Sequence, residues 1–101
     1  MRANRVDANQ PLIVKALRAH DVSVQPLNAQ KDGCPDILCG WMGGCSVIEI
    51  KMPDGKLTPH QVGWHGEWKG QKAIAHSPEE AFTIIGMTTC ASAGKGCEYH
   101  V

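Results

Sequence analysis

The feature that most constrains this chain is a pair of strand-like runs on either side of Met42-Gly43-Gly44. The runs extend from Asp36 to Trp41 and from Ser46 to Lys51. Two such runs joined by a short glycine-containing connection predict a β-hairpin. If the chain turns at Met42-Gly43, position 41 faces position 44, and Asp36 faces Glu49.

This pairing separates the hairpin residues onto two chemically different faces. Residues directly opposite each other in an antiparallel pair project to the same side, so Asp36 and Glu49 share a face. Lys51 follows Glu49 by two residues and joins them there. The other face is apolar and contains Ile37, Cys39, Ile48 and Ile50. The spacing of Glu49 and Lys51 also fits a simple surface salt bridge on an exposed strand.

The segments around the hairpin predict three helices and two further strands. The helices extend from about Gln10 to His20, from Pro59 to about Lys69, and from Pro78 to about Gly86. The strands extend from Val22 to Leu27 and from Gln71 to His76. The order helix, strand, hairpin, helix, strand, helix predicts an α/β fold, with a small mixed sheet flanked by helices. We expect one domain over residues 1–86 and a loosely ordered tail over 87–101.

Composition limits the functional classes that remain. Ten basic and ten acidic residues give zero formal net charge. This balance disfavours nucleic-acid binding through bulk positive charge. Nucleic-acid binding would then require a local basic face, or a metal ion that offsets the charge of carboxylates. The sequence has no apolar run of membrane-spanning length and no signal-peptide pattern, so we expect a cytoplasmic protein without a membrane partner. The five cysteines are then expected to be free thiols, although Cys90, Cys97 and His100 leave open a small zinc-binding interaction protein.

The shared polar face of the hairpin carries the chemistry. Two adjacent carboxylates repel each other, and a divalent cation removes that repulsion. Magnesium takes oxygen ligands and keeps several waters. A water on the metal loses its proton more easily, and a nearby lysine can orient it and stabilise charge on a phosphate. Asp36, Glu49 and Lys51 are therefore candidates for phosphodiester hydrolysis.

Three segments together resemble the PD-(D/E)XK nucleases. They are Gly33–Leu38, Ile48–Lys51 and Lys56–Gln61. More narrowly, they resemble the virus-type replication-repair nuclease (VRR-NUC) domain in its stand-alone phage and prophage form, and the resemblance extends from about Asp7 to Ile85. It implies a restriction-endonuclease-like core and a DNA endonuclease that depends on Mg²⁺ or Mn²⁺, with no small-molecule cofactor.

The resemblance also assigns roles to individual residues. It implies that Asp36 and Glu49 are metal ligands and that Lys51 is the catalytic lysine. Gln61 matches the glutamine beside the family's active site, and it also fits a capping box with Thr58, so both roles stay open. The family places an acidic ligand on its first helix, where this chain has Gln10. Asp7 lies close by in sequence and is the alternative ligand.

The substrate and assembly are expected from the same resemblance. Small stand-alone members act as junction resolvases, which implies branched DNA in phage or prophage replication, recombination or repair. Candidate phosphate contacts are Lys56, Lys69, Lys72 and Arg5. One constellation per chain and two nicks per junction predict a homodimer, with Trp64, Trp68 and Phe82 available for an interface. Trp64 and Trp68 could instead stack on bases. A monomeric nickase and a non-catalytic DNA-binding module remain the alternatives.

Overall fold

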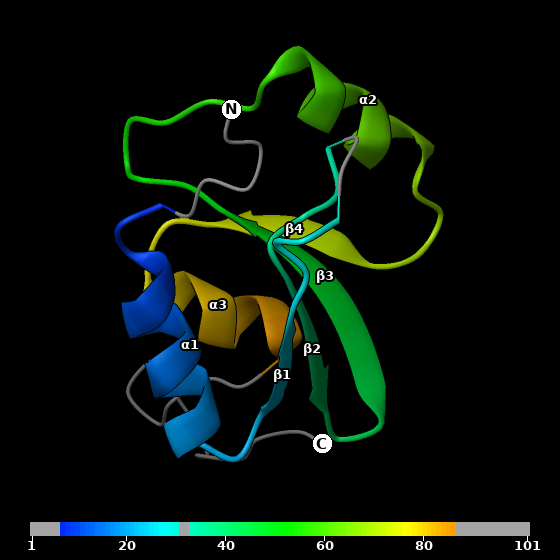
Figure 1. The fold of residues 1–101 in the computed structure, drawn as a ribbon. Coiled ribbons are helices and arrows are strands. Elements are labelled where there is room, and N and C mark those ends of the chain that lie inside the picture. Colours follow the sequence, from blue (N-terminus) through cyan, green and yellow to red (C-terminus); the bar gives the residue numbers. More distant parts are fainter. Residues whose placement is uncertain (1–6, 31–32, 87–101) are drawn as a thin grey trace.

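The elements follow one another in the order that the sequence predicts. The computed structural model describes residues 7–30 and 33–86. These residues form helices α1 (Gln10–Ala19), α2 (Pro59–Glu67) and α3 (Pro78–Ile85), and strands β1 (Ser23–Pro26), β2 (Ile37–Trp41), β3 (Gly44–Ile50) and β4 (Lys72–Ala75). The predicted α/β class, with a mixed sheet and helices, is confirmed (Figure 1).

The hairpin turn sets the register of the sheet. The strand order is β1-β2-β3-β4, with β4 parallel to β3 and the other pairs antiparallel. Met42 and Gly43 both have positive φ, 50° and 82°, which is typical of the tight two-residue turn whose twist matches the strands. Trp41 therefore lies opposite Gly44, and β3 begins two residues earlier than predicted. The predicted register is confirmed.

The core lies between one face of the sheet and two helices. Helices α1 and α3 pack on this face (Figure 1). The hairpin contributes the side chains that the sequence assigns to the apolar face, and all four are buried: Ile37, Cys39, Ile48 and Ile50. Helix α1 adds Ile13 and Leu17, both fully buried. Burying an aliphatic side chain of this size contributes about 1.5–3 kcal/mol, so this layer carries most of the hydrophobic stabilisation.

Helix α2 is placed differently. It lies beyond one end of the sheet, away from α1 and α3 (Figure 1), and none of its residues is buried. Trp64 and Trp68 stack on each other with ring centroids 4.7 Å apart, and Trp68 is 42% exposed. Trp64 and Trp68 are therefore not part of the core within the described chain.

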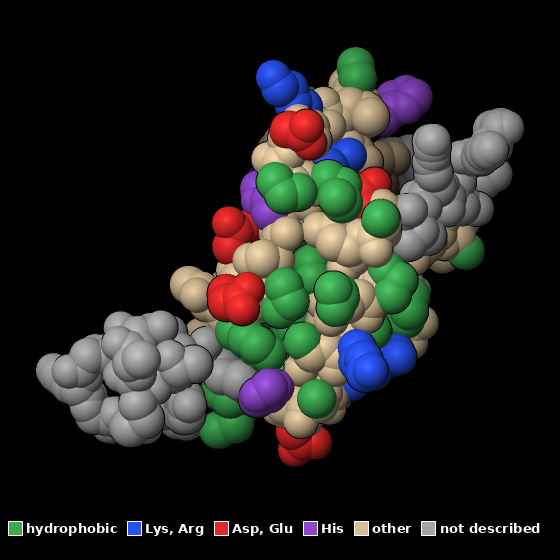
Figure 2. Space-filling model, turned by 90° about the vertical axis from the view of Figure 1, so that its left-hand side faces the viewer, with side chains coloured by type: hydrophobic (Ala, Val, Ile, Leu, Met, Phe, Trp, Pro, Cys, Tyr) green, Lys and Arg blue, Asp and Glu red, His purple; other side chains and the backbone are tan. Residues whose placement is uncertain are grey.

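The side of the molecule that carries α1 and α3 has a mixed surface. Hydrophobic side chains gather over the lower half of the described part of this face, and acidic and basic side chains lie around them (Figure 2). A charged surface of one sign does not cover it, which agrees with the zero formal net charge of the sequence.

The sequence also predicted the absence of a membrane span and a loosely ordered C-terminal tail. Within residues 7–30 and 33–86, no helix is both long and apolar enough to cross a membrane. The predicted loose tail, residues 87–101, lies outside the described residues, as does the alternative zinc set of Cys90, Cys97 and His100.

Candidate functional site

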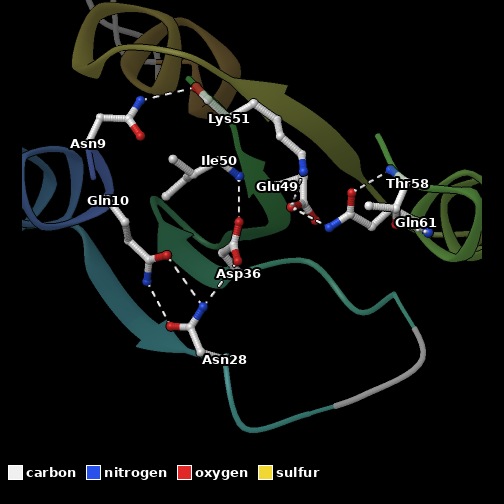
Figure 3. Close-up of polar contacts among 9 residues, drawn as sticks. All are labelled: Asn9, Gln10, Asn28, Asp36, Glu49, Ile50, Lys51, Thr58 and Gln61. Atoms are coloured by element: carbon white, nitrogen blue, oxygen red, sulfur yellow. Dashed lines mark hydrogen bonds and ion pairs between the residues drawn. The ribbon is translucent and has the colours of Figure 1, made fainter. Parts of the chain in front are cut away.

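The predicted catalytic residues converge where β2 begins and β3 ends (Figure 3). Ile37 lies opposite Ile48, and continuing this register by one residue places Asp36 opposite Glu49. Lys51 directly follows β3, and Gln61 lies in the first turn of α2. The site is therefore built from the central hairpin and from the helix that follows it.

The Asp36 carboxylate is held at both oxygens. Its Oδ2 accepts a hydrogen bond from the backbone N–H of Ile50 at 2.8 Å, and its Oδ1 accepts one from Asn28 Nδ2 at 3.0 Å (Figure 3). Burial raises the pKa of Asp36, while the hydrogen bond from Ile50 acts in the opposite direction. The carboxylate is thus fixed in orientation by two different parts of the chain.

Glu49 is more deeply buried than Asp36 and has fewer partners. Its side chain is 2% exposed, and Oε2 accepts a hydrogen bond from Gln61 Nε2 at 3.1 Å. Oε1 is buried and has no hydrogen-bond partner within the described part of the chain. Burial, followed by the neighbouring Asp36 carboxyl group, raises the pKa of Glu49 to about 8. The surface salt bridge on an exposed strand is therefore the wrong interpretation of this pattern.

Lys51 completes the polar cluster and is fixed through its backbone. Its Nζ lies 3.9 Å from Glu49 Oε2, its N–H donates to Ala75 O at 3.1 Å, and its carbonyl accepts from Asn9 Nδ2 at 3.1 Å. Asn9 also donates to His76 O at 3.1 Å. Asn9 occupies the N-cap of α1, where its side chain makes no capping bond. It instead ties the end of β3 to the end of β4.

Gln61 forms the predicted capping box with Thr58 and also contacts Glu49. Its Oε1 accepts from Thr58 N at 2.8 Å, and its own backbone N–H donates to Thr58 Oγ1 at 3.3 Å. This reciprocal capping box starts α2. The Nε2 of the same amide is left to bond Glu49, so the start of the helix and the orientation of the carboxylate depend on one side chain.

Gly33 allows the segment before Asp36 to approach α2. It has a φ of +84°, and a Cβ atom at this position would lie 2.3 Å from the carbonyl oxygen of His60. Only glycine adopts such a backbone conformation without strain and leaves room for the contact. The approach places the first turn of α2, and with it Gln61, next to the carboxylate pair.

The two first-helix candidates for a metal ligand differ in position. Gln10 is 6% exposed, and its amide is hydrogen-bonded to the amide of Asn28, which in turn contacts Asp36. The negative charge of Asp7 contributes to the raised pKa of both Asp36 and Glu49, so Asp7 lies near the pair. Asn28 could not be found from the sequence, because a single asparagine in a loop after a strand is common and Asp36, which it bonds, is eight residues away.

The carboxylate pair fits a divalent cation. The residues described contain no group of three or more histidine, cysteine or acidic side chains arranged to hold a metal. Magnesium, however, is commonly bound by one or two carboxylates together with waters and substrate phosphates. Asp36 and Glu49 supply two carboxylates, and the buried Oε1 of Glu49 has no other described partner. These two residues would hold the ion.

The four predicted phosphate contacts differ in their surroundings. Lys56 and Lys69 are exposed, on either side of α2 in the sequence. The ammonium group of Lys72 donates to the carbonyl oxygens of His65 and Trp68 and so caps the end of α2. Arg5 lies outside the described residues.

The fold and the site together define a small α/β protein in which a half-buried Asp36 and a buried Glu49 lie beside a lysine. Such a cluster can bind a hard cation and present an ammonium group to an anionic substrate. No protein-family model, curated protein or solved structure matches the chain.

Proposed function

We propose that this protein is a divalent-metal-dependent DNA endonuclease with a PD-(D/E)XK core of the VRR-NUC type. The observation that carries the proposal is the pairing of a half-buried Asp36 with a buried Glu49, with the Lys51 ammonium 3.9 Å from Glu49 Oε2. The repulsion between two neighbouring carboxylates with little access to solvent is unfavourable when both are charged. A site with two such groups, and with one Glu49 oxygen that has no partner among the residues described, is suited to a cation.

The residues of the chain divide the work of hydrolysis between them. Bound Mg²⁺ or Mn²⁺ would supply an activated water and stabilise negative charge on the phosphate. Asp36 and Glu49 would hold the ion, and Gln61 keeps Oε2 of Glu49 turned toward α2. The Lys51 side chain is 13% exposed, so its ammonium group can still reach the attacking water or a phosphate oxygen. Its fixed backbone limits where that charge can lie.

The proposed substrate is branched DNA, cut by a homodimer. One chain offers a single set of Asp36, Glu49 and Lys51, and two symmetric nicks in a four-way junction require two such sets. A two-fold dimer presents them on a two-fold substrate. The exposed side chains of α2, including Val62 and Trp68, supply apolar area for the partner subunit. Lys56 and Lys69 are exposed near the same helix and are available to phosphates.

A DNA-binding module without catalysis is the second candidate. It is favoured by one observation: the first-helix position carries the neutral Gln10, whose amide is occupied by Asn28. A site with fewer charged ligands binds a hard cation less strongly. Such a module would bind junction DNA and leave it intact in Mn²⁺.

The test is cleavage of labelled linear, flapped and four-way-junction DNA with and without Mn²⁺. Lys51→Ala and Asp36→Asn should each lower the cleavage rate by about 100-fold or more, while circular dichroism shows an intact fold. Lys15→Ala, which removes an exposed lysine from α1, is the matched control and should cleave normally. Full cleavage by either site variant would reject the proposed site.

The assembly is tested separately by light scattering and by a cruciform plasmid. A dimeric mass with linear product, and without accumulation of nicked circles, supports coordinated cutting by two sites. A monomeric mass at micromolar concentration, with nicked circles alone, would leave a structure-selective nickase.

A further inference from the structure

Two side-chain amides connect helix α1 to the Asp36 carboxylate. Gln10 Nε2 donates to Asn28 Oδ1 at 2.8 Å, and Asn28 Nδ2 lies 3.4 Å from Gln10 Oε1 and 3.0 Å from Asp36 Oδ1 (Figure 3). Both ends of each amide are therefore in use. The contacts join residues that are 18 and 8 positions apart in the chain.

The Gln10 amide is buried, and it therefore needs hydrogen-bond partners. Gln10 is 6% exposed, in the first turn of a helix, where a polar side chain ordinarily faces water. A buried amide is costly unless its donors and acceptors are satisfied, and the structure satisfies Gln10 through Asn28. In turn, the reciprocal bonds with Gln10 hold the Asn28 amide in the orientation that the acceptor-only Asp36 carboxylate requires. With Oδ1 bonded to Gln10, the NH₂ group is the end that is presented to the carboxylate.

We propose that Gln10 and Asn28 are positioning residues for Asp36, with Gln10 acting through Asn28, and that Gln10 is not itself a metal ligand. This inference rests on the proposed function, because it assigns how the metal-binding carboxylate is aimed. The Ile50 N–H fixes Oδ2 and the amide pair fixes Oδ1, so Asp36 needs no carboxylate at the Gln10 position to hold its orientation. The neutral Gln10 side chain therefore has a structural reason at this position.

The expected size of the effect follows from metal sites in general. Groups that orient a ligand without touching the metal typically change metal affinity by about 10–100-fold when removed. If Gln10 acts only through Asn28, removing both should be no worse than removing Asn28 alone. Two residues that bind the metal independently would instead give additive losses.

The experiment is calorimetric titration of Mn²⁺ into the folded chain and its variants, each first checked by circular dichroism. Asn28→Ala should weaken Mn²⁺ binding about 10-fold or more, Gln10→Ala should weaken it less, and the double variant should match Asn28→Ala. A purely structural role would lower the melting temperature without this non-additive pattern in affinity.

A near-isosteric change separates a positioning role from a ligand role. Gln10→Glu removes the Nε2 donor and turns the Asn28 amide toward a new carboxylate, so it should weaken Mn²⁺ binding. If Gln10 faced the metal, the same change would tighten binding, because it adds a charged oxygen ligand. Leu12→Glu adds a carboxylate to the same helix at a 60% exposed position and is the control for charge alone.

Each outcome has a distinct meaning. Weaker binding by Gln10→Glu together with the non-additive cycle supports the positioning pair. Tighter binding by Gln10→Glu, or additive losses, overturns it while leaving the proposed nuclease intact. A folded wild-type chain that binds no Mn²⁺ rejects the proposed metal-dependent function, and the positioning proposal with it.

Discussion

Helices α1 and α2 both border the candidate site, yet they are attached to the sheet by different kinds of contact. Helix α1 buries Ile13 and Leu17 completely against the sheet. Helix α2 has no buried residue and is held by the Gln61–Glu49 hydrogen bond, by Lys72 at its last turn, and by the close approach of Gly33. One side of the site is therefore part of the core, and the other is attached by polar contacts.

This difference extends to the two carboxylates. Asp36 is held at both oxygens, through a chain of amides that begins in α1. Glu49 depends on α2 for the hydrogen bond to its Oε2, and its Oε1 has no described partner. The Asp36 carboxylate is therefore fixed from the α1 side of the site, whereas the orientation of the Glu49 carboxylate depends on one hydrogen bond from α2.

The largest expected effect is on the free energy of unfolding. It is seen when a side chain of α1 and a side chain of α2 are each truncated to alanine. Leu17→Ala leaves a cavity in the core and should lower the free energy of unfolding by about 2–5 kcal/mol. Val62→Ala, in an exposed position on α2, should change it by less than about 0.5 kcal/mol. Urea unfolding followed by circular dichroism measures both. A large loss for Val62→Ala at concentrations where the protein dimerises would show that a second subunit covers α2.

The next effect concerns the place where α2 approaches the sheet. Gly33→Ala introduces a Cβ into the His60 carbonyl at a backbone conformation unfavourable for alanine, and should destabilise the fold by about 2 kcal/mol. Gly43→Ala is the matched control, because Gly43 has a similar φ of +82° and open space around it. The excess loss at Gly33 measures the contact with α2. Equal losses would show that the contact contributes nothing.

A smaller effect is expected on the pH dependence of stability, which reports on the buried Glu49 carboxyl group bonded by Gln61 of α2. The pKa of Glu49 is raised to about 8 in the folded chain, so its proton stabilises the fold at low pH, and this contribution is lost as the pH rises through 8. Glu49→Gln should therefore raise the stability of the metal-free protein at pH 9 by at least about 1 kcal/mol and change it little at pH 4.

Thermal melts across this pH range measure the difference. Glu79→Gln, at an exposed position on α3, is the control and should leave the pH dependence of the melting temperature unchanged. A Glu49→Gln variant with the same pH dependence as the wild type would show that Glu49 titrates normally.

The smallest effect concerns the last turn of α2. Lys72→Met removes the ammonium group that bonds the carbonyls of His65 and Trp68, and should cost about 0.5 kcal/mol. Amide hydrogen exchange should speed up selectively in α2. Lys69→Met, which changes a neighbouring exposed lysine, is the control. Unchanged exchange in Lys72→Met would assign this lysine to the solvent, where it would be available to phosphates.

The sequence predicted what depends on local rules. A two-residue turn fixes the hairpin register, so the juxtaposition of Asp36 and Glu49 followed from the turn alone. Periodicity and capping patterns located all three helices, and their ends differ from prediction by only a few residues.

What the sequence did not predict depends on contacts between distant segments. The alternation of strand residues gives the face on which Glu49 lies, but its burial depends on where the connection between β3 and α2 places that helix. The roles of Asn9 and Asn28 likewise depend on partners brought close only by the tertiary fold. For Asn9, the sequence signal is that of an ordinary helix cap, and the structure uses the side chain elsewhere.

The bonds of Asn9 also have a consequence for the order of folding. Its amide joins carbonyls that lie 42 and 67 residues further along the chain. Contacts of such sequence separation form late, because the loops between them must close first. The bond to Lys51 requires only the start of α1 and the end of the hairpin, whereas the bond to His76 also requires β4 in the sheet. The clamp on the Lys51 backbone is therefore complete only once a segment that follows Gln61, the last of the predicted catalytic residues in the sequence, has joined the sheet.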